Sequence, residues 1–316
     1  MPFPLVTDAE IIARRGPKNA LNPHEPYHCF VEREVSRFGV LEDTGVVLLT
    51  NRECPFRCLM CDLWRNTLDE RVPAGAISTQ IDFALARLPP VRHVKLYNSG
   101  NFFDAQAIPP EEFPEIAKRL GSMQTVIVEN HPRLCNESCT QFRDLLPDSV
   151  ELEIAIGLET IHPEVLERLN KRMTVDDFSR AVEFLRQRNI PTRAFVLLRP
   201  PFLAEEEAVD WALRSIEFAF SRGVRCCSVI ATRAGNGIME DLQWEDLFSP
   251  PQLSSLERVL ETALSWNSGR VFADLWDAAR LRSCPTCRES RRKRIEVMNQ
   301  TQQIPSPVSC SCRGLE

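Results

Sequence analysis

The stretch Cys54-Pro-Phe-Arg-Cys58-Leu-Met60-Cys61 indicates what kind of protein this sequence encodes. It spaces three cysteines as C-x3-C-x2-C and follows the uncharged, β-branched run 45–50, which we expect to form a buried strand. Thiols on a loop at the carboxyl end of a strand lie where α/β proteins build their sites. They suit an iron–sulfur cluster, which usually has four cysteine ligands, so one iron would keep an open position. Zinc on three thiolates and plainly buried cysteines are the alternatives.

Strand-like and helix-like segments alternate after this stretch. The predicted strands are 45–50, 91–97, 125–128, 150–156, 192–198 and 226–231. The clearest predicted helices are 77–88, 110–120, 175–187, where Thr174 is a good N-cap, and 204–221. This alternation predicts an α/β fold with a parallel sheet and right-handed crossovers, either open or closed. We expect an N-terminal cap over 1–43, a core over 44–270 and a cysteine-rich module over 271–316.

The composition fits a globular protein with a sizeable core. Of 316 residues, 43% are hydrophobic and 26% are charged. A net charge of −6 argues against broad non-specific binding to nucleic acids. No uncharged apolar run approaches the ~18 residues that span a bilayer, and residues 1–8 lack a signal-peptide pattern. Twelve cysteines without an export signal favour metal binding in a reducing cytoplasm over disulfides.

The cysteine loop and its place after the first predicted strand resemble the radical S-adenosylmethionine (SAM) enzymes. The resemblance implies a partial (β/α)6 barrel in which Cys54, Cys58 and Cys61 hold a [4Fe–4S] cluster and SAM chelates the fourth iron. An external electron donor would reduce the cluster, which then cleaves SAM to methionine and a 5′-deoxyadenosyl radical. SAM contacts are implied at the ends of later strands. The implied cofactor-binding residues are Met60, Asn98, Ser99, Gly100, Glu129, Glu159, Lys171 and Arg172.

Individual roles follow from the same resemblance. Residues 98–100 stand where many relatives have a Gly-Gly-Glu stretch whose backbone grips the SAM amino group. Glu129 occupies the place of a SAM-binding glutamate, and Glu159 that of a residue contacting the ribose hydroxyls. Lys171 aligns with an arginine that pairs with the SAM carboxylate, and Arg172 is the alternative cation.

Over residues 45–230 the order of motifs resembles the elongator-type core, and within it the radical subunit of archaeosine synthase. This resemblance points to modification of a nucleoside or a tRNA. A radical SAM enzyme acting on a small metabolite or a protein is one alternative. A non-catalytic iron–sulfur or zinc protein that binds nucleic acid is another. In the loop after the sixth predicted strand, Arg233 and Asn236 are candidate substrate contacts, although a tight turn at Gly235 and Gly237 explains the loop almost as well.

Four further cysteines lie near the C-terminus as Cys284-Pro-Thr-Cys287 and Cys310-Ser-Cys312. Such pairs can close a tetrahedral zinc site or hold an auxiliary iron–sulfur cluster. Because the segment is short and rich in Arg and Ser, we expect a metal to be needed for it to fold. A basic run over 288–294 lies between the pairs, and it is either a solvated helix face or a phosphate-contacting patch. Its candidate phosphate contacts are Arg291, Arg292 and Arg294.

Overall fold

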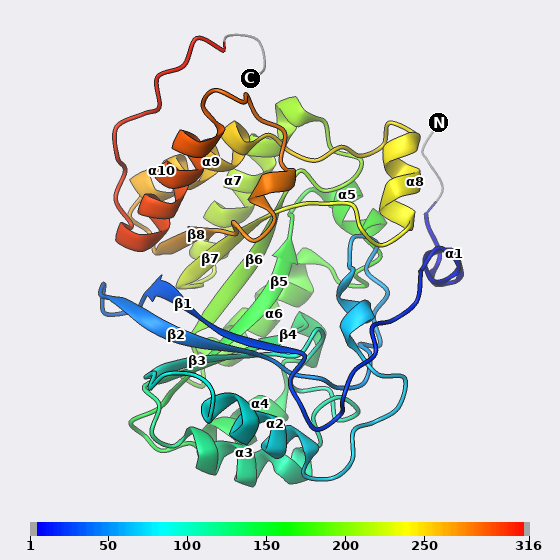
Figure 1. Cartoon of the computed structure of the whole chain (residues 1–316), viewed down its shortest axis with the longest axis vertical. Coiled ribbons are helices and arrows are strands. Elements are labelled where there is room, and N and C mark those ends of the chain that lie inside the picture. The colour runs from blue at the N-terminus through cyan, green and yellow to red at the C-terminus, as the bar shows by residue number, and fades with distance from the viewer. Residues whose placement is uncertain (1–4, 313–316) are drawn as a thin grey trace.

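The computed structural model describes residues 5–312, so the first four residues and the last four of the predicted module 271–316 lie outside it. One eight-stranded sheet runs in the order β1 to β8. Strand β1 pairs antiparallel with β2, and the strands from β2 to β8 pair in parallel. Figure 1 shows this sheet curled into a half-barrel with helices outside it, which confirms the predicted partial barrel. The strands are β1 His28–Val35, β2 Leu41–Leu48, β3 His93–Tyr97, β4 Thr125–Asn130, β5 Glu151–Glu159, β6 Thr192–Leu198, β7 Cys226–Ala231 and β8 Arg270–Ala273.

The helices cover the outer face of the sheet. In Figure 1 α2, α3 and α4 lie beside β2 to β4, whereas α9 and α10 lie beside β7 and β8. The α-helices are α1 Asp8–Ala13, α2 Ala76–Leu85, α3 Phe113–Leu120, α4 Glu137–Leu145, α5 Pro163–Arg168, α6 Val175–Arg186, α7 Glu205–Ser221, α8 Ile238–Trp244, α9 Leu253–Ser265 and α10 Arg288–Thr301. Short 3-10 helices are η1 Leu63–Asn66, η2 Pro110–Glu112, η3 Pro132–Leu134 and η4 Ala278–Arg280.

Helix α6 shows how local sequence fixes an element. The Thr174 side chain accepts a hydrogen bond from the Asp177 backbone N–H at 3.1 Å, and the Asp177 carboxylate accepts from the Thr174 N–H. This reciprocal capping box satisfies backbone donors that a helix start leaves free, and confirms the predicted N-cap. The apolar residues of the helix then recur at helical spacing and are buried against the sheet. They are Phe178, Ala181, Val182 and Leu185.

The strands alternate between an apolar outer face and a polar inner face. On β3, Val94 and Leu96 belong to the main hydrophobic core shared with the helices. The neighbouring Lys95 instead forms ion pairs with Glu32 and Glu34 of β1. Because successive side chains of a strand point to opposite faces, the interior of the half-barrel receives charged residues where many barrels pack aliphatic layers.

These charges form a buried network across the floor of the half-barrel. Arg193, 1% exposed, donates from Nη1 to Glu34 at 2.9 Å and from Nε to Glu153 at 2.7 Å. Arg270 reaches Glu153 at 3.0 Å and the Val35 carbonyl at 3.0 Å, which ties β8 to β1. The network contains three carboxylates and three cations, so its net charge is close to zero. The carboxylates belong to Glu32, Glu34 and Glu153, and the cations to Lys95, Arg193 and Arg270.

Candidate iron–sulfur and SAM site

Three asparagine side chains hold the loop that carries Cys54, Cys58 and Cys61. Asn51 donates to the Asn98 carbonyl in the turn after β3. Asn170 donates to the Arg57 carbonyl at 2.7 Å, and Asn236 donates to the carbonyls of Leu59 and Cys61 at 2.7 and 3.1 Å. These amides come from different parts of the chain. The loop between β2 and η1 is therefore fastened to the rims of several strands, although it has little regular structure of its own.

The three cysteines are half-buried and lie in a partly cationic environment. Asn101 donates from Nδ2 to the Cys54 sulfur at 3.1 Å. Burial raises the pKa of Cys58 to about 12, while the nearby Lys171 ammonium acts in the opposite direction. As free thiols they would therefore stay protonated, whereas coordination to a metal deprotonates a thiol outright.

Glu129 contacts the turn at 98–100, another predicted part of the SAM site. Glu129 lies near the end of β4, and one of its oxygens accepts from the Asn98 N–H at 2.6 Å and the Gly100 N–H at 3.3 Å. Burial raises the pKa of Glu129 to about 7, although these backbone donors act against the shift. The turn itself places Ser99 in the left-handed region, with φ of 52°. The Glu129 carboxylate thus fixes the conformation of the turn at 98–100, which follows the neighbouring strand β3.

Glu159 and Lys171 form the central ion pair of the site. Lys171 Nζ lies 2.6 Å from Glu159 Oε1, and both side chains are less than 10% exposed. The pair stands at a β-bulge, where the register shifts between Gly157 and Glu159. A Cβ at Gly157 would lie 2.2 Å from that Glu159 oxygen and 2.5 Å from Nζ. Glycine is therefore required here because it leaves space for the pair.

The two candidate cations for the SAM carboxylate, Lys171 and Arg172, point in different directions. Lys171 points inward, where its charge acts on Cys54 and Cys58. Arg172 instead pairs with Asp8 of α1 at 2.6 Å and its side chain is 53% exposed, so the interior place belongs to Lys171. Met60, another predicted cofactor contact, is partly buried and packs against two hydrophobic clusters.

Two site residues escaped the sequence reasoning. The His131 ring stacks on Phe56 of the cysteine loop at 3.8 Å, and its Nε2 lies 3.0 Å from the Lys171 carbonyl. Burial and then the Lys171 charge lower the pKa of His131 to about 3, so the ring is neutral. Tyr27 shares a hydrogen bond with Ser99 at 2.8 Å. The sequence gives no sign that Tyr27 belongs to the site, because its place there depends on β1 pairing with the sheet.

The predicted substrate contacts Arg233 and Asn236 have other partners. Asn236 is 2% exposed, and its amide binds the cysteine loop and accepts from the Met239 N–H at 3.0 Å. Arg233 pairs with Asp62 at 3.0 Å and with Asp277. The hydrogen-bonding groups of both side chains thus hold the loop and the rim together, and substrate contact by Arg233 and Asn236 stays a prediction.

The C-terminal cysteines meet as predicted, but the basic run between them does not form an open patch. Arg294 is 6% exposed and pairs with Glu257 and Glu261 of α9 at 2.9 and 2.8 Å. Arg291 also pairs with Glu257. Arg292 pairs with Glu289 one helical turn away at 2.6 Å. The charges of Arg291 and Arg294 thus anchor α10 on α9, and phosphate contact by these arginines stays a prediction.

Sequence comparison identifies the class of this site. Residues 48–212 match the family model described as the radical SAM superfamily, and this range contains the cysteine loop, Glu129, Glu159 and Lys171. The chain belongs to the radical SAM superfamily. It is accordingly an enzyme that uses a [4Fe–4S] cluster and SAM. In the described residues no helix is long and apolar enough to cross a membrane.

Three archaeal proteins are similar to the chain in sequence. The chain is 25% identical over 319 residues to an uncharacterized protein of Methanocaldococcus jannaschii, covering 92% of this chain and 86% of the relative. It is 25% identical over 298 residues to archaeosine synthase subunit beta of Methanosarcina acetivorans, covering 88% and 85%. The corresponding subunit of Thermococcus kodakarensis is 27% identical over 201 residues, 61% of each chain.

Solved structures agree on the fold. Elp3 of Methanocaldococcus infernus superposes with a TM-score of 0.53 at 14% identity, covering 81% of this chain and 64% of Elp3. SuiB of Streptococcus suis superposes with a TM-score of 0.52 at 11% identity, covering 78% and 51%. The chain thus spans less than two thirds of either solved protein, and the likeness shows the fold alone.

Proposed function

We propose that Cys54, Cys58 and Cys61 ligate the [4Fe–4S] cluster of this enzyme and that Glu129, Glu159 and Lys171 hold SAM beside it. Three thiols on one fastened loop, with an amide donor on Cys54 and a cation nearby, fit a cluster with one open iron. The observation that carries the proposal is the convergence of the cysteine loop, the Glu129-capped turn and the Glu159–Lys171 pair at one rim of the sheet.

Each side chain has a definable task. The bound cluster and SAM supply the radical chemistry, while the protein binds, orients and excludes water. The oxygens of Glu159 suit a pair of hydroxyl donors, and the Lys171 ammonium suits a carboxylate. Glu129, half-buried with a raised pKa, would be ionised by a neighbouring ammonium group and would then pair with it.

The proposal is tested by anaerobic cluster reconstitution followed by a SAM-cleavage assay. The parent should form 5′-deoxyadenosine when reduced, and the Cys54/Cys58/Cys61→Ala variant should lose both the cluster spectrum and the product. A Cys29→Ser variant is the matched control, because Cys29 is a partly buried cysteine on β1 that packs against the main core. A full cluster signal in the triple variant would overturn the ligand assignment.

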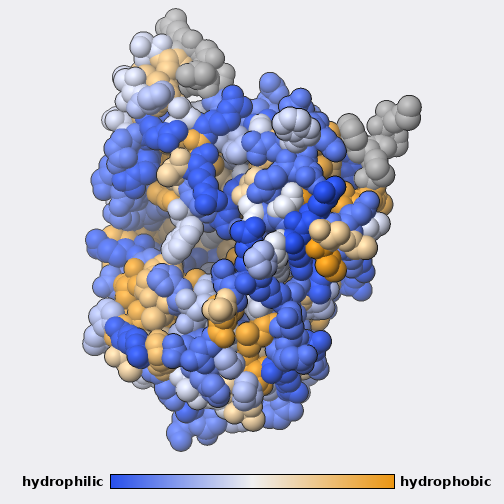
Figure 2. All heavy atoms as spheres, turned by 45° about the vertical axis from the view of Figure 1, so that its right-hand side comes forward, coloured by the Kyte–Doolittle hydropathy of each residue, from blue (hydrophilic) through white to orange (hydrophobic). Residues whose placement is uncertain are grey.

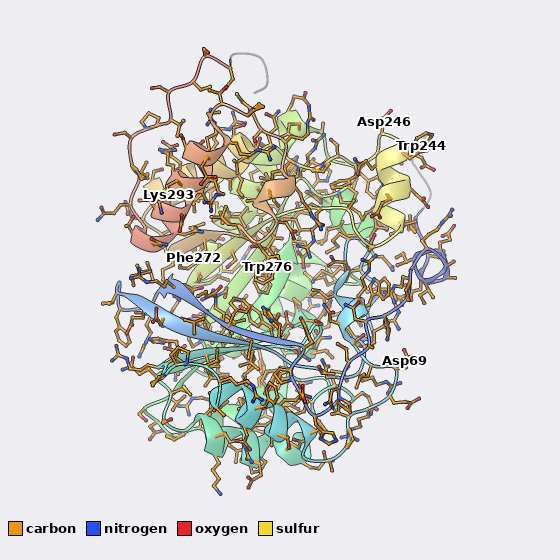
Figure 3. The ribbon with its side chains drawn as sticks, viewed as in Figure 1. Asp69, Trp244, Asp246, Phe272, Trp276 and Lys293 are labelled. Atoms are coloured by element: carbon orange, nitrogen blue, oxygen red, sulfur yellow. The ribbon has the colours of Figure 1, made fainter. Side chains whose placement is uncertain are left out.

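We infer further that the substrate is a nucleoside, as part of tRNA. Two of the relatives are named archaeosine synthase subunit beta, and the Elp3 core shares this fold. A group of aromatic side chains at the opening of the half-barrel supports the proposal of a planar substrate. There Trp276, 64% exposed, lies 5.3 Å from Phe30, and the His28 ring lies 5.3 Å from Phe30 (ring centroids). In Figure 3 the label of Trp276 lies at the centre of the view, over the strands that Figure 1 labels β5 and β6.

This aromatic surface is connected to the proposed SAM site on both sides. Tyr27, next to His28, bonds to Ser99 in the turn capped by Glu129. Asp277, next to Trp276, pairs with Arg233, which in turn pairs with Asp62 beside Cys61. A base stacked on Trp276 would therefore lie near the place where SAM is cleaved. Stacking on an aromatic side chain contributes about 1–3 kcal/mol per base.

The substrate proposal is tested with Trp276→Ala in the reconstituted enzyme, using total tRNA as the probe. We expect the variant to bind SAM normally but to lose tRNA-stimulated SAM cleavage by roughly tenfold or more, in line with one lost stacking contact. Trp244→Ala is the matched control, because Trp244 is 89% exposed on α8, well apart from Trp276 in Figure 3. Equal loss in both variants, or stimulation by small metabolites but not by tRNA, would refute the proposal.

A further inference from the structure

Besides the site at the rim, the described chain contains one more group of metal-binding side chains. The sulfurs of Cys284, Cys287, Cys310 and Cys312 all lie within 4.8 Å of one another. Cys284 and Cys310 are 4.0 Å apart, and Cys287 and Cys312 are 3.8 Å apart. We propose that these four thiolates bind a single structural zinc ion, and that this ion fastens the C-terminal tail and braces one edge of the half-barrel opening.

The spacing distinguishes zinc from the other options. Four thiolates at about 2.3 Å from a central zinc form a tetrahedron whose edges are about 3.8 Å long. An iron–sulfur cluster places several iron and sulfide atoms between its thiolates, which must then stand further apart. A disulfide needs sulfurs about 2.05 Å apart, and all four cysteines are free. The sulfur–sulfur distances therefore match one tetrahedral ion.

The surroundings suit the charge of such a site. Zinc with four thiolates carries a net charge of −2, which needs nearby donors and positive charge. Cys287 is the N-cap of α10, so the positive end of a fourteen-residue helix faces the group. Arg291, one turn further on, donates from Nε to the Cys287 sulfur at 3.3 Å. Second-shell donors of this kind are typical of built metal sites.

The position of the site explains what the ion would do. After α10, residues 303–312 form no helix or strand and are mostly exposed or half-buried. The Arg294 guanidinium binds the carbonyls of Pro305 and Ser306, but the sulfurs of Cys310 and Cys312 provide the second anchor. In Figure 1 this tail runs as an extended segment beyond α10. Without a metal, little would hold its last residues to the body of the protein.

The metal loop also supports the opening. Arg288 donates to the Ser283 hydroxyl at 2.6 Å and to the Ala279 carbonyl at 3.1 Å. Ala279 lies in η4, directly after the segment that carries Trp276 and Asp277. A chain of contacts thus runs from the four cysteines through η4 to the rim of the half-barrel. A tail without zinc should loosen η4 before it disturbs the cysteine loop at 54–61.

The test is metal analysis of the full chain, purified and reconstituted without oxygen. We expect one zinc ion per chain, with four sulfur neighbours at about 2.3 Å in the zinc-edge X-ray absorption spectrum. The Cys310→Ser/Cys312→Ser variant should lose the zinc and keep its iron. A protease should cut the variant within residues 303–312 faster than it cuts the parent. The Cys54/Cys58/Cys61→Ala variant should show the reverse pattern, losing iron and keeping zinc.

The two variants test the zinc site and the iron–sulfur site independently of each other. Cys29→Ser is the control, and it should retain both metals. If the tail variant proves unstable, the absorption spectrum of the parent decides the question without it. Zinc that persists in the tail variant, a zinc spectrum with oxygen or nitrogen neighbours, or iron equivalent to two clusters in the parent would each overturn the zinc site.

Discussion

Replacing Lys171 with methionine tests the centre of the proposed SAM site. The Lys171 ammonium is the one cation of the pair with Glu159, at 2.6 Å, with both side chains less than 10% exposed. Burial lowers the pKa of Lys171, but Glu159 and the nearby thiols raise it by more, so its net pKa lies above the ordinary value. Stability from this pair is therefore complete at neutral pH and is lost only in strong alkali.

The substitution has two separate costs. Removing one partner of a buried ion pair leaves an uncompensated charge on Glu159 and destabilises a protein by about 3–5 kcal/mol. Losing a charge-assisted contact to the SAM carboxylate weakens binding by about 1.5–3 kcal/mol, which is roughly ten- to hundredfold in Kd. The first cost appears in the unfolding free energy and the second in SAM affinity.

A double-mutant cycle separates these costs. Glu159→Gln/Lys171→Met removes both charges, so we expect it to recover much of the stability that Lys171→Met loses. It should not recover SAM affinity, because the carboxylate partner is still missing. The assays are denaturant unfolding and equilibrium SAM titration of reconstituted protein. If Lys171→Met binds SAM as tightly as the parent, or if the double variant recovers that affinity, Lys171 is a structural cation only.

Three further outcomes follow from buried groups. Arg193→Met should lower the unfolding free energy by about 3–5 kcal/mol, measured in denaturant, because it leaves Glu34 short of its main partner. Gly157→Ala should keep the fold but weaken SAM binding several-fold in a titration, since the new Cβ displaces the Glu159 carboxylate. SAM affinity of the parent should rise as pH increases through about 7, as Glu129 ionises, and the pH profile of Glu129→Gln should be flat.

The cysteine loop and the parallel strands could be predicted because their signals are local. The predicted strands 192–198 and 226–231 coincide with β6 and β7, where apolar runs are bounded by polar turns. Glu129 and residues 98–100 were both predicted at strand ends, and they meet because the carboxyl ends of neighbouring parallel strands share one edge. Periodicity and sheet topology were sufficient for these features.

Other features depend on partners far away in the sequence. Residues 28–35 were expected within a cap, since Glu32 and Glu34 make the segment look solvent-exposed, yet it forms β1. Those carboxylates face inward because Lys95 and Arg193 neutralise them. The local sequence around Glu32 and Glu34 does not indicate such pairing, because both cations are far away in the chain. Likewise, the C-terminal segment was expected to need a metal because it is short and rich in Arg and Ser, but Ile295 and Met298 of α10 are fully buried.

Strand β1 links the charged floor of the half-barrel to its reactive rim. At one end Glu34 binds Arg193, and just before the other end Tyr27 bonds to Ser99 in the turn held by Glu129. Phe30 lies between these anchors and contacts Trp276. As β1 pairs with β2 alone by backbone hydrogen bonds, its place against β8 depends on side chains. The buried ion network therefore does more than fill the interior: by fixing β1, it fixes the aromatic edge across which we propose the substrate reaches SAM.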